Sequence, residues 1–504
     1  MRAHLAPSLS TTSIAAGKLE YHLRIMLQEK VLTRCKDLWA RVRQRPRIHI
    51  GMSKPIEVHV IGAGLAGSEA AWQLAQAGVR VGLSEMRPSQ MTPAHQTGHA
   101  AEMVCSNSFK NDEATSATGI LKTEMRRLGS LILQCAEATR VPAGNSLAVD
   151  RDAFSQTVTA ALKQHPNIAW ITATETAPDL SIPTLIATGP LTAEPLVEWL
   201  SGICGGDQLF FYDAIAPIVE RDSINMDIAF RASRYNKGEA DFINCPLTMI
   251  QYERFMDALL TAERADLHDF DTPYFEACLP IEVMADRGRQ TLRYGPMKPV
   301  GLDDPRTGRW PYAAVQLRQD TLAGDHYNLV GFQTRLKWSA QRDVLHLVPG
   351  LEEAVFVRFG SIHRNTYVQA PKVLDATLAV KTVPNLWIAG QLSGVEGYLE
   401  SAAGGLAAAF FIQRALHGKP PVPLPRETML GALLHYLAHA SLKDFGPTNA
   451  MLGLMPDLPE GSLDHRALKR AGGARGLKQA KGQAHRERAL VTLEAYLLEH
   501  GVKA

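Results

Sequence analysis

The chain has 504 residues, of which 46% are hydrophobic and 21% are charged, and its formal net charge is +2. This length predicts two or three domains, and the near-neutral charge means that any contact with nucleic acid must depend on local basic segments. Six cysteines lie far apart with no C-x-x-C pair, which argues against a zinc site and a disulfide framework and favours a reducing cytoplasm. From the cysteine spacing we expect no metal. No apolar run approaches the length of a membrane span, so we also expect no membrane partner.

The N-terminal segment is basic and contains several Ser and Thr residues, which is also typical of a targeting peptide. A second methionine, Met52, begins "MSKPIEVHVIGAG", which runs directly into an expected first strand. We therefore expect residues 1–53 to be a non-structural extension, with a transit peptide as the alternative.

The most specific local pattern is "IEVHVIGAGLAGSEAAWQLAQAGVRVGLSEM", which starts at Ile56. It reads as a buried strand (56–61), a G-x-G-x-x-G turn, a helix (68–76) and a second strand (79–83). This order is typical of a dinucleotide-binding unit. The turn residues that we expect at the cofactor are Gly62, Ala63, Gly64, Leu65, Ala66 and Gly67.

Each glycine of this turn has a distinct expected role. Gly62 permits the tight turn, Gly64 lets the backbone approach a pyrophosphate, and Gly67 lets the helix pack close to the strand. The N-terminus of the helix then offers free N–H groups to the phosphates. Glu85, at the end of the second strand, is placed to accept hydrogen bonds from a ribose diol and disfavours NADP here. FAD, NAD and S-adenosylmethionine all remain candidates at this point.

The far end of the chain favours FAD. "NLWIAGQLSGVEGYLESAAGGLAAAFFIQRAL" reads as a strand (386–389), a glycine-rich loop and a helix that opens around residues 402–405. Flavoproteins of the glutathione-reductase type return a late strand and helix to the flavin in this way, and "TLIATGPLT" supplies an intermediate strand. From these segments we expect Gly189, Gly390, Gly404 and Gly405 to bind the cofactor.

The predicted fold is therefore α/β, an FAD-binding Rossmann-like domain of the glutathione-reductase type with an inserted α+β domain. We expect its first part at 54–210 and its second part at 346–425. The insert, facing substrate or RNA, takes 211–345, and a helical, basic C-terminal region takes 426–504. No second complete G-x-G-x-x-G is present, so a nicotinamide would have to dock transiently.

Cys105 has an unusual setting, in the run "EMVCSNSFKND". A cysteine that only fills a core usually has apolar neighbours, whereas small and polar residues follow this one. Its place in a loop after the second strand puts it on the side of the sheet where cofactors bind.

A series of ordered motifs resembles one family. "VIGAGLAGSEAAWQLA", "EMRP", "TPAHQT", "VCSNSFK", "ADFINCPL", "PIEVMADRG", "TLRYGPMKPVGL", "FGSIHRNTY" and "IAGQLSGVEGY" occur in this order. Together they are similar to the TrmFO family of folate- and FAD-dependent tRNA (uracil-5-)-methyltransferases, from about residue 54 to 460. The resemblance implies formation of 5-methyluridine in the T-loop of tRNA. It also implies 5,10-methylenetetrahydrofolate as carbon donor, reduced FAD as reductant and NAD(P)H to restore it.

Two alternatives stay open beside this reading. The first is the same chemistry on a ribosomal RNA uridine, and the second is a flavin oxidoreductase that methylates no RNA. The sequence sets no expectation for the oligomeric state.

The resemblance also implies site residues. Cys245, in "INCPLT", is expected to add to C6 of uracil, and Cys105 to abstract the C5 proton or guard the flavin adduct, although the two roles could be reversed. In "SIHRNTYV", His363 is expected to stack on the folate pterin with Arg364 and Asn365 nearby. The remaining cysteines that we expect to fill cores are Cys135, Cys204 and Cys278.

Local basic surfaces are the candidates for RNA contact. Residues 465–488 carry eight Lys and Arg residues and one acid, and their glycines argue against one continuous helix. Such a segment can hold phosphates by charge attraction and counterion release, although a solvated tail has the same composition. Arg126 and Arg127 could extend the basic track.

Overall fold

A computed structural model describes residues 55–204, 208–236, 239–265, 279–443, 445–462 and 465–500. The expected extension, residues 1–53, lies outside the described residues. None of the described helices is both long enough and apolar enough to cross a lipid bilayer.

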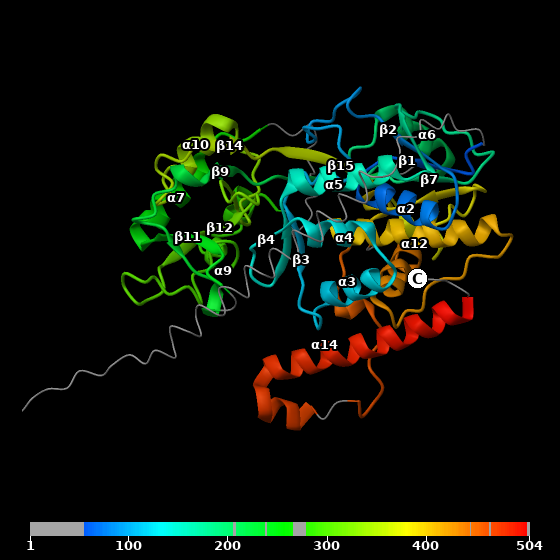
Figure 1. Cartoon of the computed structure of the whole chain (residues 1–504). Coiled ribbons are helices and arrows are strands. Elements are labelled where there is room, and N and C mark those ends of the chain that lie inside the picture. The colour runs from blue at the N-terminus through cyan, green and yellow to red at the C-terminus, as the bar shows by residue number, and fades with distance from the viewer. Residues whose placement is uncertain are drawn as a thin grey trace, which may run out of the picture. The chain divides into compact units, whose positions relative to one another are not determined.

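A five-stranded parallel sheet forms the cofactor-binding part of the fold (Figure 1). Four of its strands are nearly fully buried, which explains their largely apolar sequences, whereas the edge strand Ile168–Thr172 is mostly half-buried. The last strand comes about 200 residues after its neighbour in the sheet and pairs in register with it. The expected return of the far end of the chain to the same fold is therefore confirmed. In spatial order the strands are β16 (Leu386–Ile388), β7 (Thr184–Ile186), β1 (Val58–Ile61), β2 (Val81–Glu85) and β6 (Ile168–Thr172).

Two helices on one face of this sheet pack unusually close together. These are α2 (Leu65–Gln76) and α12 (Tyr398–Leu416), which lie side by side in Figure 1. At their contact a Cβ on Gly405 would lie 2.0 Å from the carbonyl oxygen of Ala66, so only glycine permits this approach. The helix opens at Tyr398 rather than around residue 402.

A second, six-stranded antiparallel sheet has its own apolar core (Figure 1). Its last strand lies beyond residue 345, where we expected the insert to end. In spatial order its strands are β10 (Phe230–Arg231), β11 (Phe242–Leu247), β12 (Ala313–Gln319), β13 (His326–Leu329), β9 (Ile218–Glu220) and β14 (Phe356–Arg358). The accompanying helices are α7 (Met249–Thr261), α8 (Ile281–Asp286), α9 (Thr291–Tyr294) and α10 (Trp338–Leu345).

The remaining elements connect and cover these sheets. A small antiparallel sheet comprises β3 (Ser108–Asn111), β5 (Ser146–Val149) and β4 (Arg140–Val141). An antiparallel pair, β8 (Gln208–Ala214) and β15 (Ile362–Val368), carries the chain into and out of the second sheet. The covering helices are α3 (Ala117–Arg127), α4 (Leu131–Ala138), α5 (Arg151–Gln164), α6 (Glu194–Cys204) and α13 (Met429–His439).

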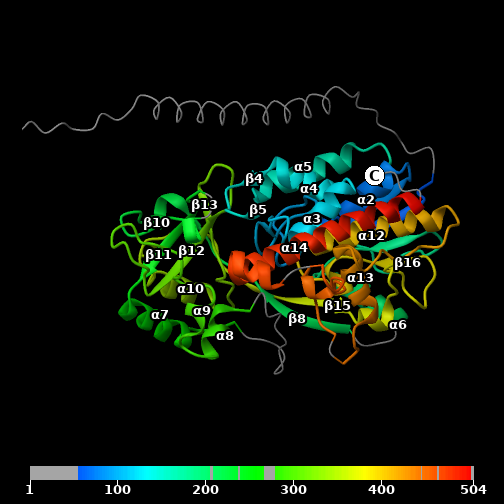
Figure 2. The same ribbon diagram turned by 90° about the horizontal axis from the view of Figure 1, so that it is seen from below.

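The C-terminal helix α14 (His465–His500) is interrupted at Gly473, where φ is +60°. The expectation that this glycine-bearing segment is not one continuous helix is therefore confirmed at Gly473. Figure 2 shows α14 running beside α3 and α12, and Tyr496 contacts Phe410 of α12 with ring centroids 5.9 Å apart.

Two buried carboxylates supplement the ordinary side-chain caps, Ser130 and Thr428, at two helix starts. Glu69 accepts hydrogen bonds from the backbone N–H groups of Leu131 and Ile132 at the start of α4. Glu124 accepts from the N–H groups of Met429 at 2.7 Å and of Leu430 at 2.9 Å at the start of α13. Each carboxylate thereby fixes one helix against another.

The glycine contact generates a stability prediction. Gly405→Ala should lower the free energy of unfolding by about 1–3 kcal/mol, because the new methyl group must push α12 away from α2. The matched control is Gly202→Ala in α6, where a Cβ meets nothing within 4 Å and the change should be neutral or slightly stabilising. Thermal unfolding of both variants measures the difference, and equal melting temperatures would contradict the tight contact.

Glu124 generates a pH prediction. Burial raises the pKa of this carboxyl to about 7, even though the two N–H groups of α13 act in the opposite direction. Its stabilising contribution is therefore complete below the unfolded pKa and is lost as the pH rises through about 7. The melting temperature of the wild type, relative to Glu124→Gln, should fall between pH 5 and pH 8. If the melting temperatures of the wild type and of Glu124→Gln change with pH in parallel, the raised pKa of Glu124 is excluded. The control is Glu137→Gln, which alters an exposed carboxylate.

Candidate active site

The turn between β1 and α2 has the geometry that the glycine spacing predicts. Gly62 has a φ of +96°, and a Cβ there would lie 2.7 Å from the Cα of Thr188. A Cβ on Gly67 would lie 1.8 Å from the carbonyl oxygen of Gly62. A Cβ on Gly64 would meet only the oxygen of Ala187, at 3.8 Å. The turn itself therefore requires two of the glycines, whereas Gly64 leaves space that a ligand can fill.

The start of α2 fits an anionic ligand. Gly64 is its N-cap residue and supplies no side-chain cap, so the positive end of the helix is available to phosphate oxygens. Gly62 and Gly64 line a cleft at the carboxyl ends of the strands, together with Glu85 and Thr188. Leu65 and Ala66 have buried side chains that do not line this cleft. Only their backbones are thus available to a cofactor.

Glu85 lies at the end of β2, inside this cleft. Burial alone would raise its pKa, but the hydrogen bonds and charge of Arg87 outweigh this effect, and the pKa lies below its usual value. Arg87 Nε donates to Glu85 Oε1 at 2.9 Å, and the N–H of Ala63 donates to Oε2 at 2.9 Å. An ionised carboxylate here fits the ribose diol of a dinucleotide such as FAD. Arg87, within "EMRP", is a cleft residue that the sequence interpretation missed.

The later glycines lie at two different places. Gly189 follows the cleft residue Thr188. A Cβ on Gly390 would lie 2.8 Å from Ala66 Cβ, and one on Gly404 would lie 3.5 Å from the N atom of Gly390. With Gly405 they place α12 against the turn of α2, and their contact with a cofactor stays a prediction.

Cys105 is half-buried in the loop before β3 and contacts the first residue of α12. Its Sγ lies 2.9 Å from the Tyr398 hydroxyl, which also accepts hydrogen bonds from the N–H groups of Cys105 at 2.7 Å and Ser106 at 3.3 Å. The contact joins residues 293 positions apart. The thiol is thus held beside the N-terminus of the helix that covers the nucleotide turn.

The second sheet reaches the same loop through the end of β12. Arg318 Nε donates to Asn107 Oδ1 at 2.9 Å, and Asn107 Nδ2 donates to the carbonyl of Gln319 at 3.0 Å. Arg151, at the start of α5, donates to the carbonyl of Met103 at 3.0 Å. The Cys105 loop therefore contacts both the end of β12 in the second sheet and the start of α5.

Cys245 has a different environment, in β11 opposite Val315. Its side chain is 0% exposed and belongs to the apolar core of the second sheet. Burial raises the pKa of this thiol far above its usual value, with a smaller contribution from Glu352. Attack on a uracil base would require this core to open. Its burial makes Cys245 a poor candidate for the nucleophile without such an opening, and the role that the sequence favoured stays a prediction.

The other site predictions have mixed outcomes. Cys135 is buried in α4, as expected. Cys278 and the side chains of Cys204, His363 and Arg364 lie outside the described residues. The backbone of His363 pairs with Asp213 in the β8–β15 ladder. Asn365, two residues further along, is buried.

The predicted basic track is partly neutralised. Arg126 Nη2 donates to Asp112 at 2.9 Å and to Glu137 at 2.6 Å, and Arg127 pairs with Glu494 of α14. These two arginines hold helices together and are not free to bind phosphates. Within the described ranges, no cluster of three or more His, Cys, Asp or Glu side chains is placed to hold a metal ion.

Comparisons with known proteins identify the family. The family model described as "Glucose inhibited division protein A" matches residues 57–420. The protein "Methylenetetrahydrofolate--tRNA-(uracil-5-)-methyltransferase TrmFO" of Anoxybacillus flavithermus is 51% identical over 443 residues, covering 88% of this chain and 99% of that protein. A protein of the same name from Staphylococcus carnosus is 54% identical over 412 residues, covering 81% and 94%.

The chain belongs to the TrmFO family. Among solved structures, GidA of Aquifex aeolicus superposes with a TM-score of 0.62 at 15% identity, covering 88% of this chain and 74% of that one. This likeness confirms the predicted fold class for a TrmFO family member.

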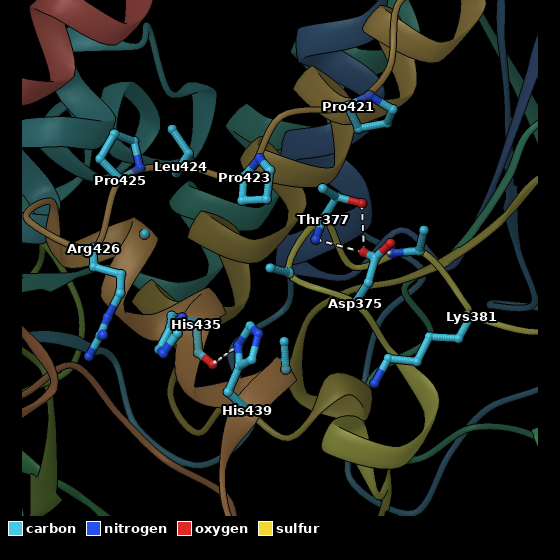
Figure 3. Close-up of a pocket in the computed structure, with 14 residues that line it drawn as sticks. Asp375, Thr377, Lys381, Pro421, Pro423, Leu424, Pro425, Arg426, His435 and His439 are labelled. Atoms are coloured by element: carbon cyan, nitrogen blue, oxygen red, sulfur yellow. Dashed lines mark hydrogen bonds between the residues drawn. The ribbon is translucent and has the colours of Figure 1, made fainter.

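A second cavity of about 840 Å³ lies away from the nucleotide cleft of this TrmFO family chain, and the two share no lining residue. Figure 3 shows its wall of prolines, with Lys381, Arg426 and the stacked His435 and His439. The cavity contains none of the predicted site residues.

The position of Glu85 in the cleft generates a prediction about FAD binding by this TrmFO family member. Glu85→Gln should weaken FAD binding about 10- to 100-fold, because the ribose diol loses a charged hydrogen-bond acceptor. Titration of the apoprotein with FAD measures the change. Glu57→Gln, which alters an exposed carboxylate paired with Arg80, is the matched control. An unchanged dissociation constant in Glu85→Gln would exclude the ribose contact.

Proposed function

We propose that this protein is a methylenetetrahydrofolate- and FAD-dependent tRNA (uracil-5-)-methyltransferase that forms 5-methyluridine at the T-loop uridine. The observation that carries the proposal is the Cys105–Tyr398 contact beside the nucleotide turn. Relatives that carry this activity in their names, at 51% and 54% identity, support it. The reaction belongs in the cytoplasm, where thiols stay reduced.

The chemistry requires two groups with lone pairs. C5 of uracil is a poor nucleophile, and addition of a thiolate to C6 gives C5 the electron pair with which it attacks a methylene carbon. A base then takes the C5 proton, and the C–H electron pair expels the thiolate from C6. Bound FAD would supply the electrons that convert the methylene group to a methyl group, with NAD(P)H as the source.

Cys105 is our candidate for the base. It is half-buried in a loop rather than in a core, and it is held in position by Tyr398. Folate would contact the segment of His363, Arg364 and Asn365. Turn residues Gly62 to Gly67 and Glu85 would hold FAD.

RNA would approach with its target base turned out of the loop, because neither the thiol nor a flavin can reach a stacked base. Lys478 and Lys481 on α14 are exposed and are our candidates for phosphate contacts. Arg488 is less available, since it donates to the carbonyls of Pro456 and Asp457.

The decisive assay uses unmodified tRNA, methylenetetrahydrofolate and NADPH with the FAD-loaded protein. 5-Methyluridine should form at the T-loop uridine and should not form with S-adenosylmethionine alone. Methylation supported by S-adenosylmethionine, or product only in ribosomal RNA, would overturn the proposed activity or its target.

The thiols are tested with RNA that contains 5-fluorouracil, which traps the C6 adduct. Cys105→Ala should abolish methyl transfer. Cys245→Ala should retain the adduct, because this thiol is buried in a core. Loss of the adduct in Cys245→Ala, with the fold intact, would instead identify Cys245 as the thiol that adds to C6, as the sequence predicted. Cys278→Ala tests the other cysteine of the insert, and Cys135→Ala controls for loss of a buried thiol.

A further inference from the structure

The hydroxyl of Tyr398 has one proton and two lone pairs. The N–H groups of Cys105 and Ser106 both donate to its oxygen, at 2.7 Å and 3.3 Å, and occupy the lone pairs. Burial raises the pKa of Tyr398 well above its usual value, so the phenol keeps its proton. The remaining partner is Cys105 Sγ, at 2.9 Å. The phenol therefore donates to sulfur, and a hydrogen bond of this kind favours the charged thiolate.

Two arginines clamp the loop that carries this sulfur. Arg151 Nη1 donates to the carbonyls of Met103 at 3.0 Å and Val104 at 3.4 Å, directly before Cys105. Arg318 donates to Asn107, directly after it. Both guanidinium groups are close enough to Cys105 to interact with it electrostatically, as is that of Arg358.

Positive charge around the loop exceeds negative charge. Asp320 pairs with Arg151 at 3.1 Å, and Glu102 pairs with Arg87 at 3.1 Å while also facing Arg358. Burial lowers the pKa of Arg318 to about 10, against the opposing effect of Asp320. Arg151 Nη2 is buried and has no hydrogen-bond partner in the described part of the chain. Burial of Arg318 outweighs the effect of Asp320, so its positive charge is incompletely compensated and this environment stabilises an anion.

We propose that Arg151, Arg318 and Tyr398 hold Cys105 as a thiolate in the resting protein. They are positioning residues that make Sγ ready to accept a proton at neutral pH. The use of this thiolate as the base for C5 rests on the proposed function, whereas its existence does not.

The test is the pH dependence of Cys105 alkylation by iodoacetamide in the FAD-loaded protein, followed on the Cys105 peptide by mass spectrometry. The midpoint for the wild type should lie at least about one pH unit below the roughly 8.5 of an ordinary thiol. Tyr398→Phe and Arg151→Gln should each move it upward, and one unit corresponds to about tenfold slower alkylation at pH 7. Arg151→Lys, which keeps the charge, should restore most of the shift.

Arg231→Gln is the matched control, because this arginine donates to the Tyr327 hydroxyl in the second sheet and not to the Cys105 loop. Tyr398→Phe removes only one oxygen atom, so it keeps the test valid if Arg151→Gln does not fold. A wild-type midpoint near 8.5, or a midpoint unmoved in Tyr398→Phe, would overturn the inference. If methylation persists alongside such a result, the proposed function survives without the thiolate.

Discussion

The close contact between α12 and α2 is the constraint on which the site depends. Gly405 lets α12 rest on the backbone of Ala66, and this contact fixes the direction of α12 relative to the nucleotide turn. The N-terminus of α12 then lies at the Cys105 loop, where Tyr398 contacts the thiol. A longer distance between the helices would move Tyr398 away from sulfur without changing either residue.

The buried ionisable groups have two contrasting environments, one around the carboxyl groups and one around Cys105. Glu69, Glu124 and Glu85 each accept backbone N–H hydrogen bonds. Burial nevertheless raises the pKa of Glu69 and Glu124, whereas Arg87 keeps that of Glu85 below its usual value. Around Cys105 the arrangement is different, because Arg151 and Arg318 share one nearby carboxylate, that of Asp320. The buried carboxylates join elements of the fold. The two arginines, in contrast, leave an excess of positive charge that a Cys105 thiolate can balance.

The sequence predicted the parts of the site that depend on local spacing. The glycine turn and Glu85 lie within about 25 residues, and strand–turn–helix geometry places them together without further information. Whether the Cys245 side chain is buried depends on the pairing of β11 with β12, some 70 residues later, and on which face of the sheet is covered. The motif "INCPLT" holds no information about that. Arg151, Arg318 and Tyr398 come from three distant segments, so only the folded chain brings them to Cys105.

The order of strands also has a consequence for biosynthesis. α2 leaves the ribosome more than 300 residues before α12, which covers it, and β16 follows its neighbour β7 by about 200 residues. At about 5–20 residues per second, the apolar face of α2 waits tens of seconds for its partner. The nascent chain therefore exposes an uncovered helix for most of translation, and an unfinished sheet edge while about 200 residues are added. The flavin site is completed only when translation is nearly finished.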